Sequence, residues 1–284
     1  MHVATNQMRR DAAKRKLASQ QARRAQQAAR RRQIAVISSA AVVVVVLLAV
    51  VALSTIGRGG DTPAAATAPS DAANATSAAA QPAAGGPGTC AYPSDGNAAK
   101  PNTPPPTEGV SNEGTVSVAL TTSAGPIGLT LNRAEAPCTV NSFAGLAGQG
   151  YFDGTVCHRL TIGEGLKVLQ CGDPTGTGTG GPGYTIPDEA PTTLASAPSG
   201  QGTVIYPRGT VAMAKTAQPN SGGSQFFLVY ADSTLPPEYT VFGTIDDDGL
   251  ATIDKVAAAG TDDSNGSGDG KPKTPIEIQT ATVS

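Results

Sequence analysis

The sequence predicts an all-β dominated fold. This is an eight-stranded closed antiparallel β-barrel with two capping α-helices over residues 114–284, preceded by one transmembrane helix and a disordered tether. Short strand-like segments recur between Gly, Pro, Asn and Asp residues, without the longer spacing of βαβ units. Two other stretches have helical periodicity. Closing the strands into a barrel would remove exposed sheet edges.

The first 33 residues form a basic arm. Residues 1–32 contain ten Lys or Arg and one acidic residue, whereas the rest of the chain contains ten Lys or Arg and twenty-one Asp or Glu. The net charge of −2 therefore combines a segment of about +9 with a remainder of about −11. We expect the arm to stay in the cytoplasm against anionic lipid head groups. RNA binding is the less favoured alternative, so no nucleic-acid partner is expected.

An uncharged apolar segment, Ile34–Ile56, follows the arm. As a helix this segment would be about 34 Å long, enough to cross a hydrocarbon core of about 30 Å. A cleaved signal peptide is less favoured, because its apolar core would have only about 7–15 residues. The basic arm then places the C-terminal domain outside, in a single-pass protein of the cell membrane.

Residues 57–113 are rich in Ala, Pro, Thr, Ser and Gly and contain almost no large apolar side chains. Such a segment cannot bury enough surface to offset the entropy that it would lose on ordering. We expect a tether with a reach of about 40 Å between the membrane and a single domain at residues 114–284.

The domain is expected to contain two helices between its strands. One helix is expected over Thr139–Gln149, after Pro137, and the other over Leu250–Ala258, ending at Gly260. Each helix is expected to cover one open end of the barrel. The eight expected strands are Thr115–Leu120, Ile127–Leu131, Thr155–Leu160, Lys167–Cys171, Thr210–Ala214, Gln225–Val229, Val241–Ile245 and Ile276–Val283.

Four cysteines, Cys90, Cys138, Cys157 and Cys171, follow the apolar segment. No CxxC pair occurs, so a zinc site is poorly supported and no metal or other cofactor is expected. Disulfides are favoured in an oxidising exterior, and buried free thiols are the alternative. His158, the one histidine of the domain, falls in an expected strand, and we interpret it as a satisfied core residue rather than part of a nucleophilic triad.

Four short motifs occur in order along the domain. They are GYFDGTVCHR at Gly150–Arg159, QCGD at Gln170–Asp173, SQFF at Ser224–Phe227 and VFG at Val241–Gly243. These segments resemble the GYYDG-x-x-FHR, QGGD, SQFF and VFG signatures of cyclophilins. The resemblance covers essentially all of residues 114–284. It implies an eight-stranded barrel with two capping helices and peptidyl-prolyl cis–trans isomerase activity, directed here at exported or cell-envelope proteins.

The chemistry of that activity suits the matched residues. Rotation about an X-Pro bond meets a barrier near 20 kcal/mol, because resonance gives the C–N bond partial double-bond character. A catalyst has to hold the twisted amide and draw the nitrogen lone pair out of conjugation. By resemblance, Arg159 is the charged group directed at the prolyl nitrogen, and Gln170 bonds the substrate backbone beside the rotating bond. Lysine would not present the same planar fork.

The resemblance also implies a substrate site. The apolar residues of this site are expected to hold the proline ring, with Met213 at the floor of the pocket. Gln225 and the backbone around Lys215 are expected to hold the residues of the peptide that flank the proline. The implied substrate-binding residues are Val168, Met213, Lys215, Gln225, Phe227, Leu235 and Tyr239. For each apolar side chain the alternative is ordinary core packing.

The sequence departs from the cyclophilin pattern around this pocket. About three extra residues lie within 161–166, Lys167 stands where an aromatic residue is usual, and Thr234 replaces a frequent tryptophan. Tyr239 stands where a histidine is common. We therefore expect reduced but present activity on proline-containing polypeptides, and weak cyclosporin binding.

Two disulfides follow as hypotheses from the resemblance. Cys157 and Cys171 fall on strands that pair in the implied barrel, and Cys90 would then pair with Cys138 at the first helix. Nothing in the sequence requires more than a monomer. The main functional alternative is a cyclophilin-like peptide-binding or chaperone module without catalysis, and a purely structural barrel is a more remote one.

Overall fold

The computed structural model describes residues 88–284 except residues 199 and 201. The expected basic arm at 1–33, the expected membrane helix at 34–56 and the first part of the expected tether, 57–87, lie outside the described residues. Within the described part of the chain, no helix is both long enough and apolar enough to span a bilayer.

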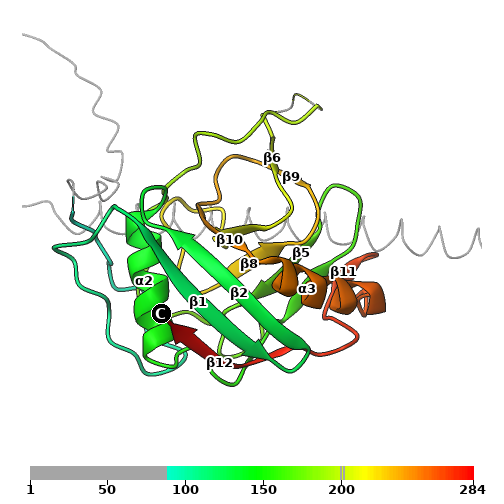
Figure 1. Ribbon diagram of the computed structural model, residues 1–284, viewed down its shortest axis with the longest axis horizontal. Coiled ribbons are helices and arrows are strands. Elements are labelled where there is room, and N and C mark those ends of the chain that lie inside the picture. The colour runs from blue at the N-terminus through cyan, green and yellow to red at the C-terminus, as the bar shows by residue number, and fades with distance from the viewer. Residues whose placement is uncertain (1–87, 199, 201) are drawn as a thin grey trace, which may run out of the picture. The chain divides into compact units, whose positions relative to one another are not determined.

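One curled antiparallel sheet forms the centre of the domain, and a two-stranded ribbon of β6 and β9 lies beside it (Figure 1). The order of strands in the sheet is β11-β4-β5-β8-β7-β10-β2-β1-β12-β3. The strands are β1 Thr115–Thr122, β2 Gly125–Asn132, β3 Thr155–Val156, β4 Arg159–Thr161, β5 Val168–Cys171, β6 Val204–Tyr206, β7 Thr210–Met213, β8 Phe226–Val229, β9 Ser233–Leu235, β10 Val241–Ile245, β11 Asp269–Gly270 and β12 Glu277–Val283.

The sheet is a curled half-barrel and not the closed barrel of eight strands that the sequence predicts. Within the described residues, no ladder joins the two end strands, β11 and β3. The expected strand Thr155–Leu160 is interrupted at Cys157 and His158. Before the interruption the chain pairs with β12 as strand β3, and after it the chain pairs with β5 as strand β4. Because β3 and β4 lie near opposite ends of the strand order, the chain itself connects the two sides at this interruption.

The core lies inside the curled sheet. Every second residue of β1 is buried, as the period of two in a strand requires when one face packs on a core. The ring of Phe143 lies at the centre, with its centroid 4.8 Å from Phe152, 5.0 Å from Phe226 and 5.2 Å from Phe242. Strand β1 also pairs with β12, with Val118 opposite Val283, so the sheet joins residues from both ends of the domain.

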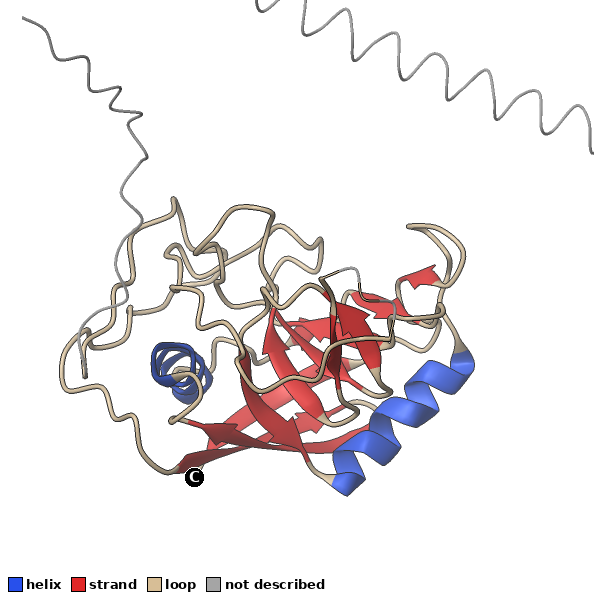
Figure 2. Cartoon of the chain, turned by 90° about the horizontal axis from the view of Figure 1, so that it is seen from above, coloured by secondary structure: helices blue, strands red, loops and turns tan. Residues whose placement is uncertain are grey.

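Two helices pack against the core of this curled sheet, to which both contribute buried side chains such as Phe143 and Ile253, and Figure 2 shows them at separate places around the sheet. Helix α2, Pro137–Gly148, begins with a proline and packs against β12, β1 and β2. Helix α3, Asp247–Ala259, packs on β2, and the side chain of Asp246 accepts a hydrogen bond from Gly249 N at 2.8 Å. Both predicted helices are confirmed. They begin two or three residues earlier than expected, because proline and aspartate at a first turn carry no apolar periodicity.

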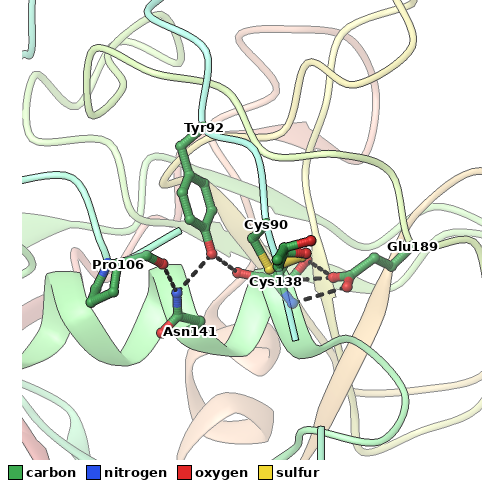
Figure 3. Close-up of a disulfide and its surroundings, with 8 residues drawn as sticks. Cys90, Tyr92, Pro106, Cys138, Asn141 and Glu189 are labelled. Atoms are coloured by element: carbon green, nitrogen blue, oxygen red, sulfur yellow. Dashed lines mark hydrogen bonds between the residues drawn. A yellow bond between two sulfur atoms is a disulfide. The ribbon is translucent and has the colours of Figure 1, made fainter. Parts of the chain in front are cut away.

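Residues 88–113, the last part of the expected tether, lie against the domain. The disulfide Cys90–Cys138 fastens them to the start of α2, and the hydroxyl of Tyr92 donates to the carbonyl of Cys138 at 2.9 Å (Figure 3). Farther along, Lys100 donates to the carbonyls of Gly150 and Asp153. These contacts order a segment whose composition alone predicts a coil.

The second disulfide joins Cys157, in the interruption between β3 and β4, to Cys171 at the end of β5. All four cysteines are therefore paired, and both hypothesised pairings are present. The alternative of buried free thiols does not hold in this structure.

Candidate active site

Four neighbouring strands bring together a row of side chains on the outer face of the sheet. Arg159 of β4 is opposite Gln170 of β5, Gln170 is opposite Phe227 of β8, and Phe227 is opposite Ala212 of β7. The residues between them in each strand, such as Leu169, face the main core. Strand alternation therefore sets the predicted catalytic pair and the predicted proline-binding phenylalanine side by side.

Arg159 is held by a carboxylate that the sequence analysis did not identify. Its Nε donates to Asp269 Oδ1 at 2.8 Å, and its Nη2 donates to Asp269 Oδ2 at 2.6 Å. The contact lowers the pKa of Asp269 and raises the pKa of Arg159. Asp269 lies on the two-residue strand β11, which pairs with β4. Only a prediction of this strand pairing could have identified Asp269 as a partner of Arg159.

A chain of amide side chains continues from the guanidinium. Arg159 Nη1 donates to Gln170 Oε1 at 3.4 Å, Gln170 Nε2 donates to Gln225 Oε1 at 3.0 Å, and Gln225 Nε2 donates to the carbonyl of Gly180 at 3.0 Å. Each amide keeps a second hydrogen and a second lone pair for another partner. The chain therefore fixes both glutamines while leaving them able to bond a peptide backbone.

An apolar patch, which we define by its buried base and its rim, lies beside this chain. Val168, Tyr206, Ala212, Phe227 and Val229 form the buried base. The half-buried rim includes Leu166, Leu194, Val204, Ala214, Leu235 and Tyr239. The predicted residues Val168, Phe227, Leu235 and Tyr239 thus come together, and the rings of Phe227 and Tyr239 meet edge to face at 5.5 Å. Rim residues Leu194 and Val204 lie outside the four motifs, and no local sequence pattern indicates them.

The structure does not bring Met213 to this patch. Met213 faces the main core, on the opposite side of β7 from Ala212. Ala214, one residue later, lies on the rim of the patch instead. Lys215 is nearly buried, with 8% of its side chain exposed, and its Nζ bonds Asp188 Oδ2 at 2.5 Å. Its charge is therefore already paired.

Two hollows share Gln170 in their lining. We call the first the flanking groove. It has a volume of about 430 Å³, and its lining includes Asp95, Asn97, Gln170, Gly181, Lys215 and Gln225. The second has a volume of about 540 Å³, and its lining includes His158, Arg159, Gln170, Asn265 and Lys271. Both hollows adjoin Gln170, and the first also reaches Ala214 on the rim of the apolar patch.

His158 is not the satisfied core residue that we expected. It is half-buried beside the second hollow, and neither ring nitrogen has a hydrogen-bond partner within the described residues. Burial lowers the pKa of His158 below its ordinary value of 6.5, outweighing the opposite effect of Asp173. The imidazole is therefore neutral at neutral pH.

The isomerase activity that the resemblance to cyclophilins implies for this site should not depend on pH between about 6.5 and 9. Rotation about a peptide bond requires no proton transfer, Arg159 and Asp269 remain ionised throughout this range, and His158 remains neutral. We expect kcat/KM for an X-Pro peptide to vary by less than about two-fold. Exchange NMR in overlapping buffers at constant ionic strength measures this, and a bell-shaped profile within the range would contradict it.

Comparison with known proteins agrees with this geometry. A family model described as "Cyclophilin type peptidyl-prolyl cis-trans isomerase/CLD" matches residues 117–283. The chain is 56% identical over 194 residues to "Probable peptidyl-prolyl cis-trans isomerase B" of Mycobacterium leprae (strain TN), covering 67% of this chain and 65% of that protein. It is also 56% identical over 193 residues to the protein of the same name from Mycobacterium tuberculosis (strain ATCC 25618 / H37Rv), covering 66% of this chain and 62% of that protein.

A more distant relative is matched over most of its own length. "Peptidyl-prolyl cis-trans isomerase" of Helicobacter pylori (strain ATCC 700392 / 26695) is 39% identical over 144 residues, covering 50% of this chain and 80% of that protein. By contrast, the chain spans less than two thirds of the length of the two mycobacterial proteins. The chain belongs to the cyclophilin-type peptidyl-prolyl cis-trans isomerase family.

Proposed function

We propose that the protein is a peptidyl-prolyl cis–trans isomerase acting on X-Pro bonds of polypeptides. The observation that carries the proposal is the row Arg159–Gln170–Phe227, which joins a charged donor, a backbone-binding amide and an apolar surface on adjacent strands. Family membership supports the same activity.

The mechanism follows from how the guanidinium is held. Asp269 engages Nε and Nη2 of Arg159, so Nη1, which also contacts Gln170, is the nitrogen free to approach the prolyl nitrogen. The proline ring packs on the apolar patch around Phe227, while Gln170 bonds the substrate backbone. As the amide twists, the nitrogen lone pair leaves conjugation and accepts a hydrogen bond from Nη1. This interaction is stronger in the twisted state than in the planar one and therefore lowers the barrier.

A direct test is exchange NMR on a short X-Pro peptide with the full-length chain. The proposal expects faster cis–trans exchange at catalytic protein concentrations. Shifts of the peptide resonances without faster exchange would refute it and favour the second candidate, a peptide-binding or chaperone module without catalysis. The observation behind that candidate is the bidentate ion pair, which offsets much of the charge of Arg159 with Asp269.

We further propose that the protein is a monomer anchored in the cell membrane by residues 34–56, with the domain outside the cytoplasm. Exported or cell-envelope proteins would then be its clients. The basic arm preceding an apolar run supports the orientation, and the two disulfides support an oxidising compartment. Recovery of the protein in the soluble cytoplasmic fraction of cells, or protection of the domain from protease added to intact spheroplasts, would refute this location.

Cyclosporin should bind weakly. Thr234 stands on β9 beside Leu235, and it offers no indole N–H and little apolar area in place of the frequent tryptophan. We expect Thr234→Trp to increase cyclosporin affinity by about ten-fold or more, whereas Thr234→Val should leave it nearly unchanged. Isothermal titration calorimetry measures both variants, and nanomolar binding by the unaltered protein would contradict the expectation.

A further inference from the structure

The segment that precedes the domain forms one wall of the flanking groove. Asp95 and Asn97 line the groove together with Gln170 and Gln225 of the amide chain. These two residues lie within 57–113, which the sequence analysis assigned to a tether. Part of the candidate substrate site is therefore supplied by residues outside the matched family region, 117–283.

Backbone hydrogen bonds hold this wall in place. Asp95 N donates to the carbonyl of Gly183 at 2.9 Å, Ala99 N donates to the carbonyl of Gly181 at 2.9 Å, and Thr185 N donates to the carbonyl of Pro93 at 2.9 Å. Residues 93–99 thus run as a strip antiparallel to residues 181–185, with an isolated bridge at Ser94 and Tyr184. These backbone hydrogen bonds fix the wall to the domain.

Gly183 permits the close approach of this strip. Its φ is +82°, and a Cβ at this position would lie 2.8 Å from the backbone nitrogen of Ala98. A side chain here would push the strip away from the groove. On either side of the contact, the strip is fastened by the Cys90–Cys138 disulfide and by the bonds of Lys100 to Gly150 and Asp153.

The charge of the groove is set by Asp95. Among the charged residues of its lining, Lys215 is already paired with Asp188 at 2.5 Å and is nearly buried. The carboxylate of Asp95 is exposed and has no hydrogen bond or ion pair within the described residues. A peptide side chain that enters the groove therefore meets one unpaired negative charge among backbone amides, hydroxyls and side-chain amides.

We propose that Asp95 is a specificity-determining residue that favours substrates with a Lys or Arg within three residues of the proline. This rests on the proposed function and names a substrate class for the same site. The cation lies against the Asp95 carboxylate, while the proline occupies the apolar patch around Phe227. The pair is partly hydrated, so its contribution is that of a surface ion pair and falls with added salt.

The experiment uses the full-length chain and six peptides that share one proline. Three carry Lys, norleucine or Glu two residues before the proline, and three carry them two residues after it. We expect Lys to exceed norleucine by about two- to five-fold in affinity and in kcat/KM in at least one set, with Glu the weakest. Affinity is measured by chemical-shift titration and kcat/KM by exchange NMR.

Variants test whether this preference comes from Asp95. Asp95→Asn should equalise Lys and norleucine, Asp95→Lys should reverse the order in favour of Glu, and 0.5 M salt should reduce the preference of the unaltered protein. Glu277→Gln, on β12 and away from the groove lining, is the matched charge control and should retain the preference. Thermal unfolding should be similar for all variants, because the side chains of Asp95 and Glu277 are exposed and make no hydrogen bond or ion pair within the described residues.

The outcomes separate the two proposals. Isomerisation without any charge preference, or a preference that Asp95→Asn leaves unchanged, overturns the role of Asp95 and leaves the proposed function standing. Binding that prefers Lys and depends on Asp95, without isomerisation by the unaltered protein, overturns the proposed function and supports the role of Asp95.

Discussion

Replacing Arg159 by Ala should lower kcat/KM for X-Pro isomerisation by about 10²–10³-fold, the usual effect of removing one transition-state hydrogen-bond donor. The affinity for the peptide should change much less, because the apolar patch around Phe227 and the amides of Gln170 and Gln225 remain. Exchange NMR gives the rate and chemical-shift titration gives the affinity. A rate within about two-fold of the unaltered protein would exclude the proposed role of Arg159.

Two further variants separate the charge of Arg159 from its geometry. Arg159→Lys keeps the charge but cannot bond both oxygens of Asp269 while presenting a second nitrogen to the substrate, so most of the loss should remain. Arg159→Ala combined with Asp269→Asn removes the unpaired carboxylate that the single variant leaves behind. Because about a third of each side chain is exposed, 34% for Arg159 and 28% for Asp269, we expect neither variant to lower thermal stability strongly. Recovery of activity in the double variant would show that the stray carboxylate, and not the missing guanidinium, caused the loss.

Removing the disulfide Cys90–Cys138 by replacing both cysteines with Ser should destabilise the domain by about 4 kcal/mol. The two cysteines are separated by 48 residues, so the link removes a large loop entropy from the unfolded chain. The midpoint of thermal unfolding should fall by about 10 °C. Urea denaturation monitored by circular dichroism, without reductant, measures the change in the free energy of unfolding.

The second disulfide provides the control. Cys157 and Cys171 are separated by 14 residues, and replacing both with Ser should cost less, about 3 kcal/mol. Added dithiothreitol should bring the unaltered protein to the stability of the variant that lacks all four cysteines. Equal stability of the unaltered protein and the Cys90→Ser/Cys138→Ser variant would show that residues 88–113 are held by their hydrogen bonds alone.

The long elements could be predicted from the sequence because their patterns are local. The alternation in β1 and the punctuation around β10 predict strands there, and β10 has the predicted bounds of Val241–Ile245. Strands β6, β9 and β11 have two or three residues each, and they exist only because a partner strand lies beside them. A segment of two or three residues is too short to show the hydrophobic periodicity by which a strand is predicted.

The candidate site was predictable where a motif carries it and not elsewhere. Arg159, Gln170, Gln225 and Phe227 lie within motifs and come together as expected. Met213 was assigned to the wrong face of its strand, because a shift of one residue exchanges the two faces of a sheet. Asp269 lies about 110 residues from Arg159 along the chain, and no local pattern connects them.

The pairing of β1 with β12 has a consequence for the order in which the chain can fold. Synthesis proceeds from the N-terminus, so the hairpin of β1 and β2 is made about 150 residues before β12, whose residues 278–283 pair with β1. Until then one edge of β1 is an open row of backbone donors and acceptors, which favours pairing with other chains. The nascent domain thus depends on late residues to cover an early edge. Its folding should be slow for its size, as is usual when contacts join distant parts of a chain.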